Sequence, residues 1–234
     1  MANPRPGELA IRPLTAARVD DVKTVTAGTW GATCWDLFPR FTAKQERERG
    51  LTGKGEAPRR AALARLARRR QAPGLVAYRD GEPIGWIALG PRADFTRVDV
   101  SRATPRVDDV AVWVIPCLTV RRGRRGQGVA IAMIRAAAQY AARHGAPAVE
   151  AYPRADSARL HDDFAFYGTA AMFRKAGFHR VRGPLAGLPK NWTPRVTMRA
   201  LTAPPRRPPR ASVPSRARGA RSRPRASRRA RPGR

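Results

Sequence analysis

A basic, glycine-rich segment at residues 121–130 contains the residue types that bind an anion. Gly123, Gly126 and Gly128 alternate with arginines, between a long apolar run and a run with helical periodicity. The first turn of a helix offers backbone N–H groups that have no partner within the helix, and the positive end of the helix dipole. Glycines let a ligand approach the backbone closely, and arginines add charge-assisted hydrogen bonds. The segment therefore predicts a cradle for a diphosphate.

The elements that position this segment are predicted from the hydrophobic pattern. Residues 110–120 are the most apolar run and predict a strand, which Pro116 must splay or bulge because proline donates no ladder hydrogen bond. Residues 129–144 place apolar side chains on one stripe and predict a helix that ends at Gly145. Residues 148–152 predict a strand parallel to the first, since a helical crossover joins the two.

The remaining pattern is that of a mixed α/β domain. Asp80 and Gly81 lie between two apolar runs and predict a tight hairpin, because both residue types tolerate positive φ. Further strands are expected at residues 9–14, 75–78, 83–89, 178–181 and 195–199, and further helices from residue 16, at 59–70 and at 169–176.

Residues 117–130 resemble motif A of the GNAT N-acetyltransferase superfamily. That motif has the form Arg/Gln-x-x-Gly-x-Gly/Ala, and a strand ends in valine five residues before it. Val120 and Arg125 have this spacing. Residues 172–178 are similar to the superfamily's helix-to-strand junction, and residues 11–15 are similar to its first strand.

The resemblance covers about residues 9–201 and implies a GNAT-like mixed sheet of six or seven strands, splayed between two central parallel strands, with flanking helices. It implies acetyl-CoA as acyl donor, an amine of a small molecule or protein as acceptor, direct attack on the thioester, and no metal. A backbone N–H near Leu118 is the implied oxyanion donor. The cofactor-binding residues that it implies are Leu118, Thr119, Val120, Arg125, Gly126, Gln127, Gly128, Val129 and Ala130.

The sequence departs from the superfamily pattern where proton transfer is expected. Phe173 lies where a tyrosine commonly protonates the leaving thiolate, and Phe166 lies where an asparagine is frequent. Tyr167 is the nearest candidate acid, with Tyr152, water or no acid as alternatives. Glu150, beside the splay, is the candidate base. Three other acids are expected to be solvated: Asp108, Asp109 and Glu82.

Charge predicts a second, separate segment. The chain of 234 residues has a net charge of +30, of which residues 203–234 carry +12 with no acid, leaving +18 on residues 1–202. The tail has too few apolar residues to offset its ordering entropy, so a GNAT-like domain at 9–202 and a disordered Arg/Pro-rich tail are expected. Non-specific contact with polyanions is one expected use of the tail.

Composition excludes several other classes. Two cysteines make neither a disulfide framework nor a zinc site, and no run reaches the ~18 apolar residues of a membrane span. A cytoplasmic protein without a membrane partner is expected. Two alternatives stay open: a catalytically inactive acyl-CoA-binding module of the same fold, and a basic nucleic-acid-binding protein with salt-sensitive affinity. The sequence reveals neither the acceptor nor the oligomeric state.

Overall fold

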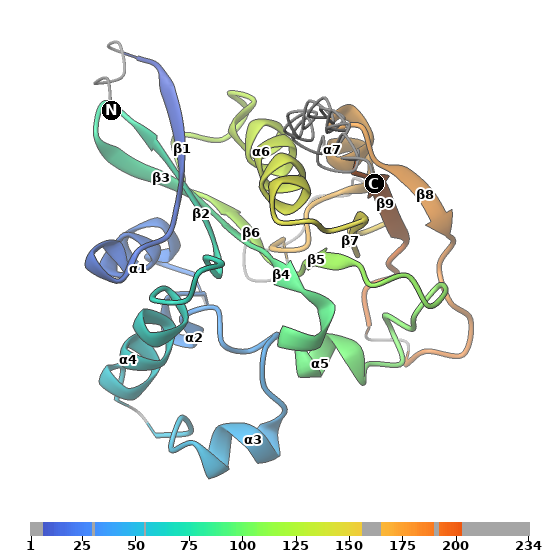
Figure 1. The fold of residues 1–234 in the computed structure, drawn as a ribbon, viewed down its shortest axis with the longest axis horizontal. Helices are drawn as coiled ribbons and strands as arrows, with labels where there is room; N and C mark the ends of the chain where they lie inside the picture. The colour runs from blue at the N-terminus through green and yellow to red at the C-terminus, as the bar shows by residue number, and fades with distance from the viewer. Residues whose placement is uncertain (1–6, 30, 54, 156–164, 190–191, 203–234) are drawn as a thin grey trace, which may run out of the picture.

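A computed structural model of the chain describes residues 7–202, except residues 30, 54, 156–164 and 190–191. The expected tail at 203–234 lies outside the described part, and so does Trp30, which from the sequence could line the acceptor pocket or pack in the core. Within it, helices flank a sheet that is split into two parts (Figure 1). The mixed α/β class is therefore confirmed.

The first part of the sheet is a four-stranded antiparallel unit in the order β1-β2-β3-β6. Its strands are β1 (Leu9–Pro13), β2 (Gly74–Arg79), β3 (Glu82–Ala88) and β6 (Leu118–Val120). Asp80 and Gly81 turn the chain between β2 and β3 with φ of 51° and 81°. The predicted hairpin is confirmed.

The second part is a five-stranded unit in the order β4-β5-β7-β9-β8. Its strands are β4 (Gly90–Pro91), β5 (Trp113–Ile115), β7 (Ala148–Ala151), β8 (His179–Arg182) and β9 (Thr197–Leu201). β5 and β7 run parallel, with Val114 opposite Glu150, while the other pairs are antiparallel. The predicted parallel pair is confirmed.

Two interrupted strands join the two parts. The chain passes from β3 to β4 through Leu89, and from β5 to β6 through Pro116 and Cys117. The strand expected at 110–120 is thus two short strands in different sheets, because Pro116 cannot donate to a ladder. β5 pairs with β7, whereas β6 leaves to pair with β3, so the sheet opens beside β6 as expected.

Helices cover both faces of the split sheet. They are α1 (Asp20–Thr26), α2 (Gly31–Cys34), α3 (Ala43–Glu48), α4 (Ala57–Leu66), α5 (Thr96–Asp99), α6 (Val129–Arg143) and α7 (Ala170–Lys175), with 3-10 turns at Ala16–Arg18 and Arg92–Asp94. The helix expected from Ala16 begins instead as a 3-10 turn, and Thr15 makes no capping bond. No helix among the described residues is long and apolar enough to cross a bilayer.

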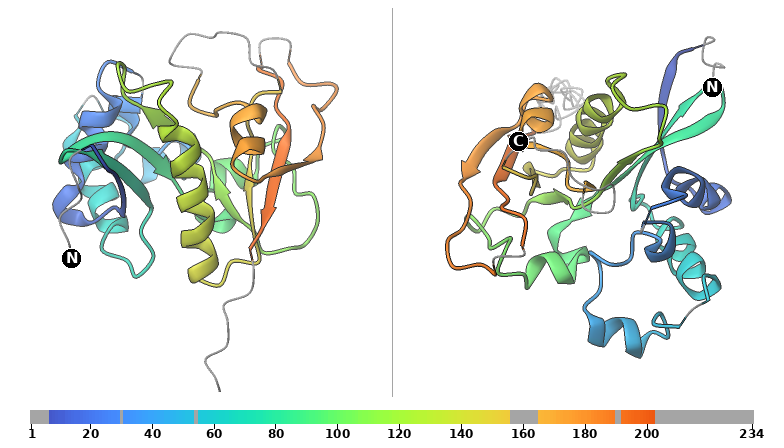
Figure 2. Two further views of the ribbon diagram at one scale, coloured as in Figure 1. Left: turned by 90° about the horizontal axis from the view of Figure 1, so that it is seen from above. Right: turned by 180° about the vertical axis from the view of Figure 1, so that it is seen from behind.

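The long helix α6 forms the centre of the main core. Its stripe of Met133, Ile134, Ala137 and Ala141 is fully buried against both parts of the sheet. Figure 2 shows α6 in front of the region where the two parts diverge. On the opposite face of the first part, Trp86 and its neighbours pack against α1 and α4 in a second cluster. These two layers hold the β5–β6 interruption in place.

Candidate functional site

A cavity of about 410 Å³ opens beside β6, where the sheet splits. Its walls are β6, the loop before α6, the first turn of α6, the start of α7, and parts of residues 29–39. The loop and helix that the sequence predicted as an anion cradle therefore border this open cavity.

The backbone of β6 presents alternate groups to this cavity. The Arg121 N–H donates to the Ile84 carbonyl at 3.0 Å, and the Ala88 N–H donates to the Cys117 carbonyl at 3.0 Å. Because backbone groups alternate in direction along a strand, those of Thr119, which lies midway between Cys117 and Arg121, also point toward β3. Leu118 and Val120 consequently direct their N–H and C=O groups away from β3. An extended ligand arm could pair with these groups as an added strand does.

The N–H of Leu118, the expected oxyanion donor, has a partner in this structure. It donates to the Phe166 carbonyl at 2.8 Å. For that N–H to bind a thioester oxygen, the segment that carries Phe166 has to move. This contact was not foreseen because it joins residues that are distant in the sequence.

The N-terminus of α6 has the features of an anion site. Gly128 is the N-cap, with φ of 76°, and Gly126 has φ of 75°. A Cβ at either glycine would meet no atom within 4 Å, so the left-handed backbone, and not lack of space, requires glycine there. Arg124, Arg125 and Lys175 also line the cavity and supply positive charge.

Eight of the nine expected cofactor-binding residues line this cavity, and Gln127 does not. The Gln127 side chain accepts a hydrogen bond from Arg79 and donates to the Gly123 carbonyl at 3.2 Å, so it braces the loop. Glu82 accepts from Arg124 at 2.9 Å and ties the same loop to the β2–β3 hairpin. Binding of a cofactor by these residues stays a prediction.

A second cavity, of about 750 Å³, adjoins the first. Phe38, Pro39 and Phe166 line both cavities, and Pro116 lines the second at the interruption between β5 and β6. A donor and an acceptor could therefore approach the same point from two sides.

Tyr167, the predicted acid, lines the second cavity next to this meeting point. Its ring centroid is 4.0 Å from that of Phe166, and the Arg195 guanidinium carbon is 4.4 Å from the Tyr167 ring centroid. Burial raises the pKa of the Tyr167 phenol above its usual value of 10, although Arg195 opposes the shift. Tyr167 is therefore protonated at neutral pH and able to donate a proton.

Asp36 is a site residue that the sequence reasoning missed. It lines the first cavity, yet its side chain is only 2% exposed. Among the described residues, neither carboxylate oxygen has a hydrogen-bond partner, and Arg40 Nε lies 3.6 Å from Oδ2. A lone acid within the apolar run 34–38 was the signal that could have identified it.

The backbone at Asp36 is strained. Trp35 and Asp36 have φ of 50° and 58°, a conformation that costs non-glycine residues of order 1–3 kcal/mol each. Burial raises the pKa of the Asp36 carboxyl to about 6, against the lowering effect of Arg40. Burial thus makes this carboxyl, at the cavity wall, more prone to take up a proton than an exposed aspartate.

The two cysteines also line the first cavity, as free thiols. Burial raises the pKa of Cys34 to about 11 and that of Cys117 well above its usual value. Both are therefore protonated at neutral pH, which makes them poor nucleophiles. From the sequence, Trp35 could either line the acceptor pocket or pack in the core, and the structure places it in the core.

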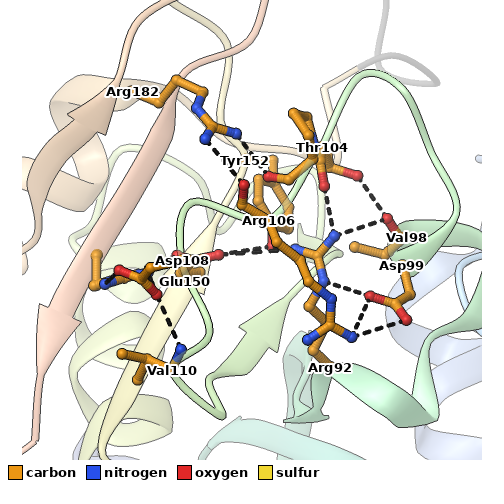
Figure 3. A network of polar contacts seen from close by, with 12 residues as sticks. Arg92, Val98, Asp99, Thr104, Arg106, Asp108, Val110, Glu150, Tyr152 and Arg182 are labelled. Carbon is orange, nitrogen blue, oxygen red and sulfur yellow. Dashed lines mark hydrogen bonds and ion pairs between the residues drawn. The ribbon is translucent and has the colours of Figure 1, made fainter.

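Glu150, the predicted base, lies elsewhere. Val149 and Ala151 pack toward α6, so Glu150 between them faces the other side of β7. Figure 3 shows its carboxylate within a buried network. Arg199 donates to Oε1 at 3.0 and 2.6 Å and Tyr152 donates to Oε2 at 3.0 Å.

The rest of this network contains Tyr152 and Asp108, which the sequence analysis also considered for proton transfer. The hydroxyl of Tyr152 accepts from Arg92 at 2.5 Å, and burial raises its pKa. Asp108 forms a bidentate pair with Arg199, at 2.7 and 2.9 Å. Glu150 lines neither cavity among the described residues, so this geometry gives no support to its prediction as the base. The network stabilises the sheet instead.

No group of three or more His, Cys, Asp or Glu side chains within the described ranges could hold a metal ion.

Comparison with known proteins identifies the family to which the chain belongs. The acetyltransferase (GNAT) family model matches residues 35–166, more than half of the chain. No curated protein matches.

Solved structures with a similar arrangement include two N-acetyltransferases. PaiA N-acetyltransferase from Thermoplasma acidophilum, in complex with coenzyme A, is 11% identical over 83% of this chain and 99% of its own, with a TM-score of 0.48. Polyamine N-acetyltransferase from Drosophila melanogaster is 13% identical over 83% of this chain and 100% of its own, with a TM-score of 0.49.

Proposed function

The chain belongs to the acetyltransferase (GNAT) family of acyltransferases, and we propose that it transfers the acetyl group of acetyl-CoA to the amine of an acceptor. The observation that carries this proposal is the pair of cavities that meet at the β5–β6 interruption. One cavity is bordered by the anion-binding end of α6, and the other has an aromatic wall that includes Tyr167.

The residues of the first cavity fit the parts of a CoA thioester, which supplies an activated acetyl group. The N–H groups of residues 126–130 bind the diphosphate, and Arg124, Arg125 and Lys175 neutralise its charge. The backbone of Leu118 and Val120 pairs with the amides of the pantetheine arm. The fit is supported by the outward-facing edge of β6 and by the left-handed glycines at the start of α6.

Asp36 and Tyr167 fit the two proton transfers that acetyl transfer requires. A bond forms between the nitrogen of the neutral amine and the acetyl carbon, while the bond between that carbon and sulfur breaks. Asp36 lines the donor cavity and Tyr167 lines the acceptor cavity, so both proton transfers take place across the point where the two cavities meet. There Asp36 accepts the proton that the amine loses, and Tyr167 donates a proton to the leaving thiolate. Direct transfer is favoured over an acyl-cysteine because burial keeps both thiols protonated.

A second candidate is an acyl-CoA-binding module without catalysis. The contact between the Leu118 N–H and the Phe166 carbonyl favours it, because that contact occupies the oxyanion donor. An acceptor screen that monitors release of free CoA separates the two. Release above the background of acetyl-CoA hydrolysis supports the enzyme.

Calorimetric titration with acetyl-CoA at moderate salt tests the proposed function. We expect saturable binding that the Gly126→Asp/Gly128→Asp double variant loses, because two carboxylates would repel the diphosphate. The matched control is Gly28→Asp/Gly50→Asp, which places acids at two other open glycines with positive φ. Absence of binding to the unaltered protein, or equal binding to the first variant, contradicts the proposal.

A further inference from the structure

The second cavity has an apolar lining with two positively charged residues. Among its described lining residues, those with ionised side chains at neutral pH are Arg97 and Arg195. The apolar part of the lining includes Phe38, Pro39, Val98, Val100, Phe166 and Trp192. This combination suits a ligand with an apolar body and a negative group.

Contacts with Phe38 and Glu46 hold the Arg97 side chain in the wall of the cavity. Its Nε donates to the Phe38 carbonyl at 2.7 Å, and its guanidinium carbon is 4.0 Å from the Phe38 ring centroid. Glu46 lies 3.6 Å from its Nη2. Arg97 therefore holds Phe38 in place and has part of its charge neutralised.

The contacts of Arg195 differ from those of Arg97. Its guanidinium lies over the Tyr167 ring, and within the described ranges no carboxylate oxygen is within 4.0 Å of its nitrogens. A guanidinium that stacks on an aromatic ring keeps its N–H edge for hydrogen bonding, and that edge matches a carboxylate in a bidentate pair. Arg195 is thus oriented by the residue proposed as the acid and retains donors for a ligand.

We propose that the acceptor is an amine that carries a carboxylate and an apolar body, as a hydrophobic amino acid does, and that Arg195 binds its carboxylate. This inference rests on the proposed acetyl transfer and names the substrate class of the same site. The net charge of +18 on residues 1–202 supports it, since a positive field raises the local concentration of anions and repels polycations.

Matched acceptors test the proposal with acetyl-CoA as donor. Phenylalanine and phenethylamine share the amine and the aromatic body, and only the first carries a carboxylate. We expect kcat/KM to be about tenfold or more higher for phenylalanine, and Arg195→Gln to remove that preference. Arg180→Gln, on the exposed β8, is the matched control and is expected to retain the preference.

Product binding extends the test beyond turnover. In the presence of CoA, N-acetylphenylalanine is expected to bind more tightly than N-acetylphenethylamine, and Arg195→Gln is expected to abolish the difference. Equal or inverted preference, or binding of neither product, overturns the inference. Because acetyl-CoA binding is measured separately by titration, a normal titration with no carboxylate preference rejects only the inference. A failed titration rejects the acetyl-transfer function itself.

Discussion

Asp36 combines several energetically unfavourable features in one residue. Its carboxylate is buried, its oxygens lack hydrogen-bond partners among the described residues, and its backbone is left-handed. Because burial raises the pKa to about 6, the carboxyl is protonated below this pH and is an available base above it. Loss of this proton is therefore expected to give a rise in rate with pH through about 6, separate from any rise at higher pH as the acceptor amine loses its own proton.

Replacement of this base gives the first prediction. Asp36→Asn is expected to lower kcat by about 10²-fold or more and to abolish the rise in rate near pH 6, because the amide accepts no proton. The measurement is the pH profile of kcat, with Asp20→Asn, an exposed carboxylate paired with Arg60, as control. A profile that keeps its rise near pH 6 in Asp36→Asn contradicts the assignment.

Tyr167 gives a second prediction. Tyr167→Phe preserves the ring beside Phe166 and Arg195 but removes the proton that the thiolate needs, so kcat is expected to fall by about 10²-fold with little change in KM. Steady-state kinetics measure this, with Tyr78→Phe, outside both cavities, as control. An unchanged kcat would mean that water protonates the thiolate, or that the thiolate leaves without being protonated by an acid.

Glu150 is expected to behave as a structural residue. Glu150→Gln removes the buried carboxylate that Arg199 and Arg92 share, while Asp108 and Asp99 stay paired with them, and this is expected to lower the free energy of unfolding by about 2 kcal/mol. Urea denaturation measures the loss, and the pH profile of kcat is expected to keep its shape. Loss of the rise near pH 6 with unchanged stability would restore Glu150 as the base.

At the scale of elements, Gly74 allows β2 and β3 to approach each other closely, and Gly85 allows α6 to approach β3. A Cβ at Gly74 would lie 2.3 Å from the Ile87 carbonyl oxygen, whereas a Cβ at Gly85 would meet the Met133 sulfur at 2.7 Å. Backbone yields less than a flexible thioether, so Gly74→Ala is expected to cost about 3 kcal/mol and Gly85→Ala about 1 kcal/mol. Thermal or urea unfolding of both variants checks the order, and the reverse order would contradict this packing.

The sequence predicted the elements that have strong periodicity. The anion loop, the helix that follows it and the parallel strand after that helix form as expected, because glycine positions and a buried stripe specify them locally. It did not predict α2, α3 or α5, which have four to six residues and depend on tertiary contacts. Pro116 indicated an irregular strand, but not that its halves would belong to different sheets.

The candidate site was predictable only in part for a similar reason. A local motif identified β6 and the loop that border the first cavity, whereas the cavity also needs Asp36 and Phe166, which are far from that motif in the sequence. Burial of Asp36 follows from packing between separate elements, which one sequence does not reveal. Glu150 was favoured because its strand lies beside the splay, but its side chain faces the other side of that strand.

For the whole molecule, the charge of residues 203–234 is expected to act separately from catalysis. Deletion of residues 203–234 removes twelve arginines and leaves in place every described residue that lines the two cavities. Acetyl transfer is expected to be unchanged, while affinity for duplex DNA falls and depends less steeply on salt. Steady-state kinetics and fluorescence anisotropy at several salt concentrations measure these effects. Lost turnover, or unchanged DNA affinity, would show that the tail is not an independent basic segment.

A crystal structure of the protein with acetyl-CoA and phenylalanine tests the central claim most directly, since it locates donor and acceptor together. The account predicts the diphosphate on the N–H groups of residues 126–130, the thioester at the β5–β6 interruption, and the amine entering from the cavity lined by Tyr167. A donor bound elsewhere, or an acceptor on the same side as the donor, would contradict it.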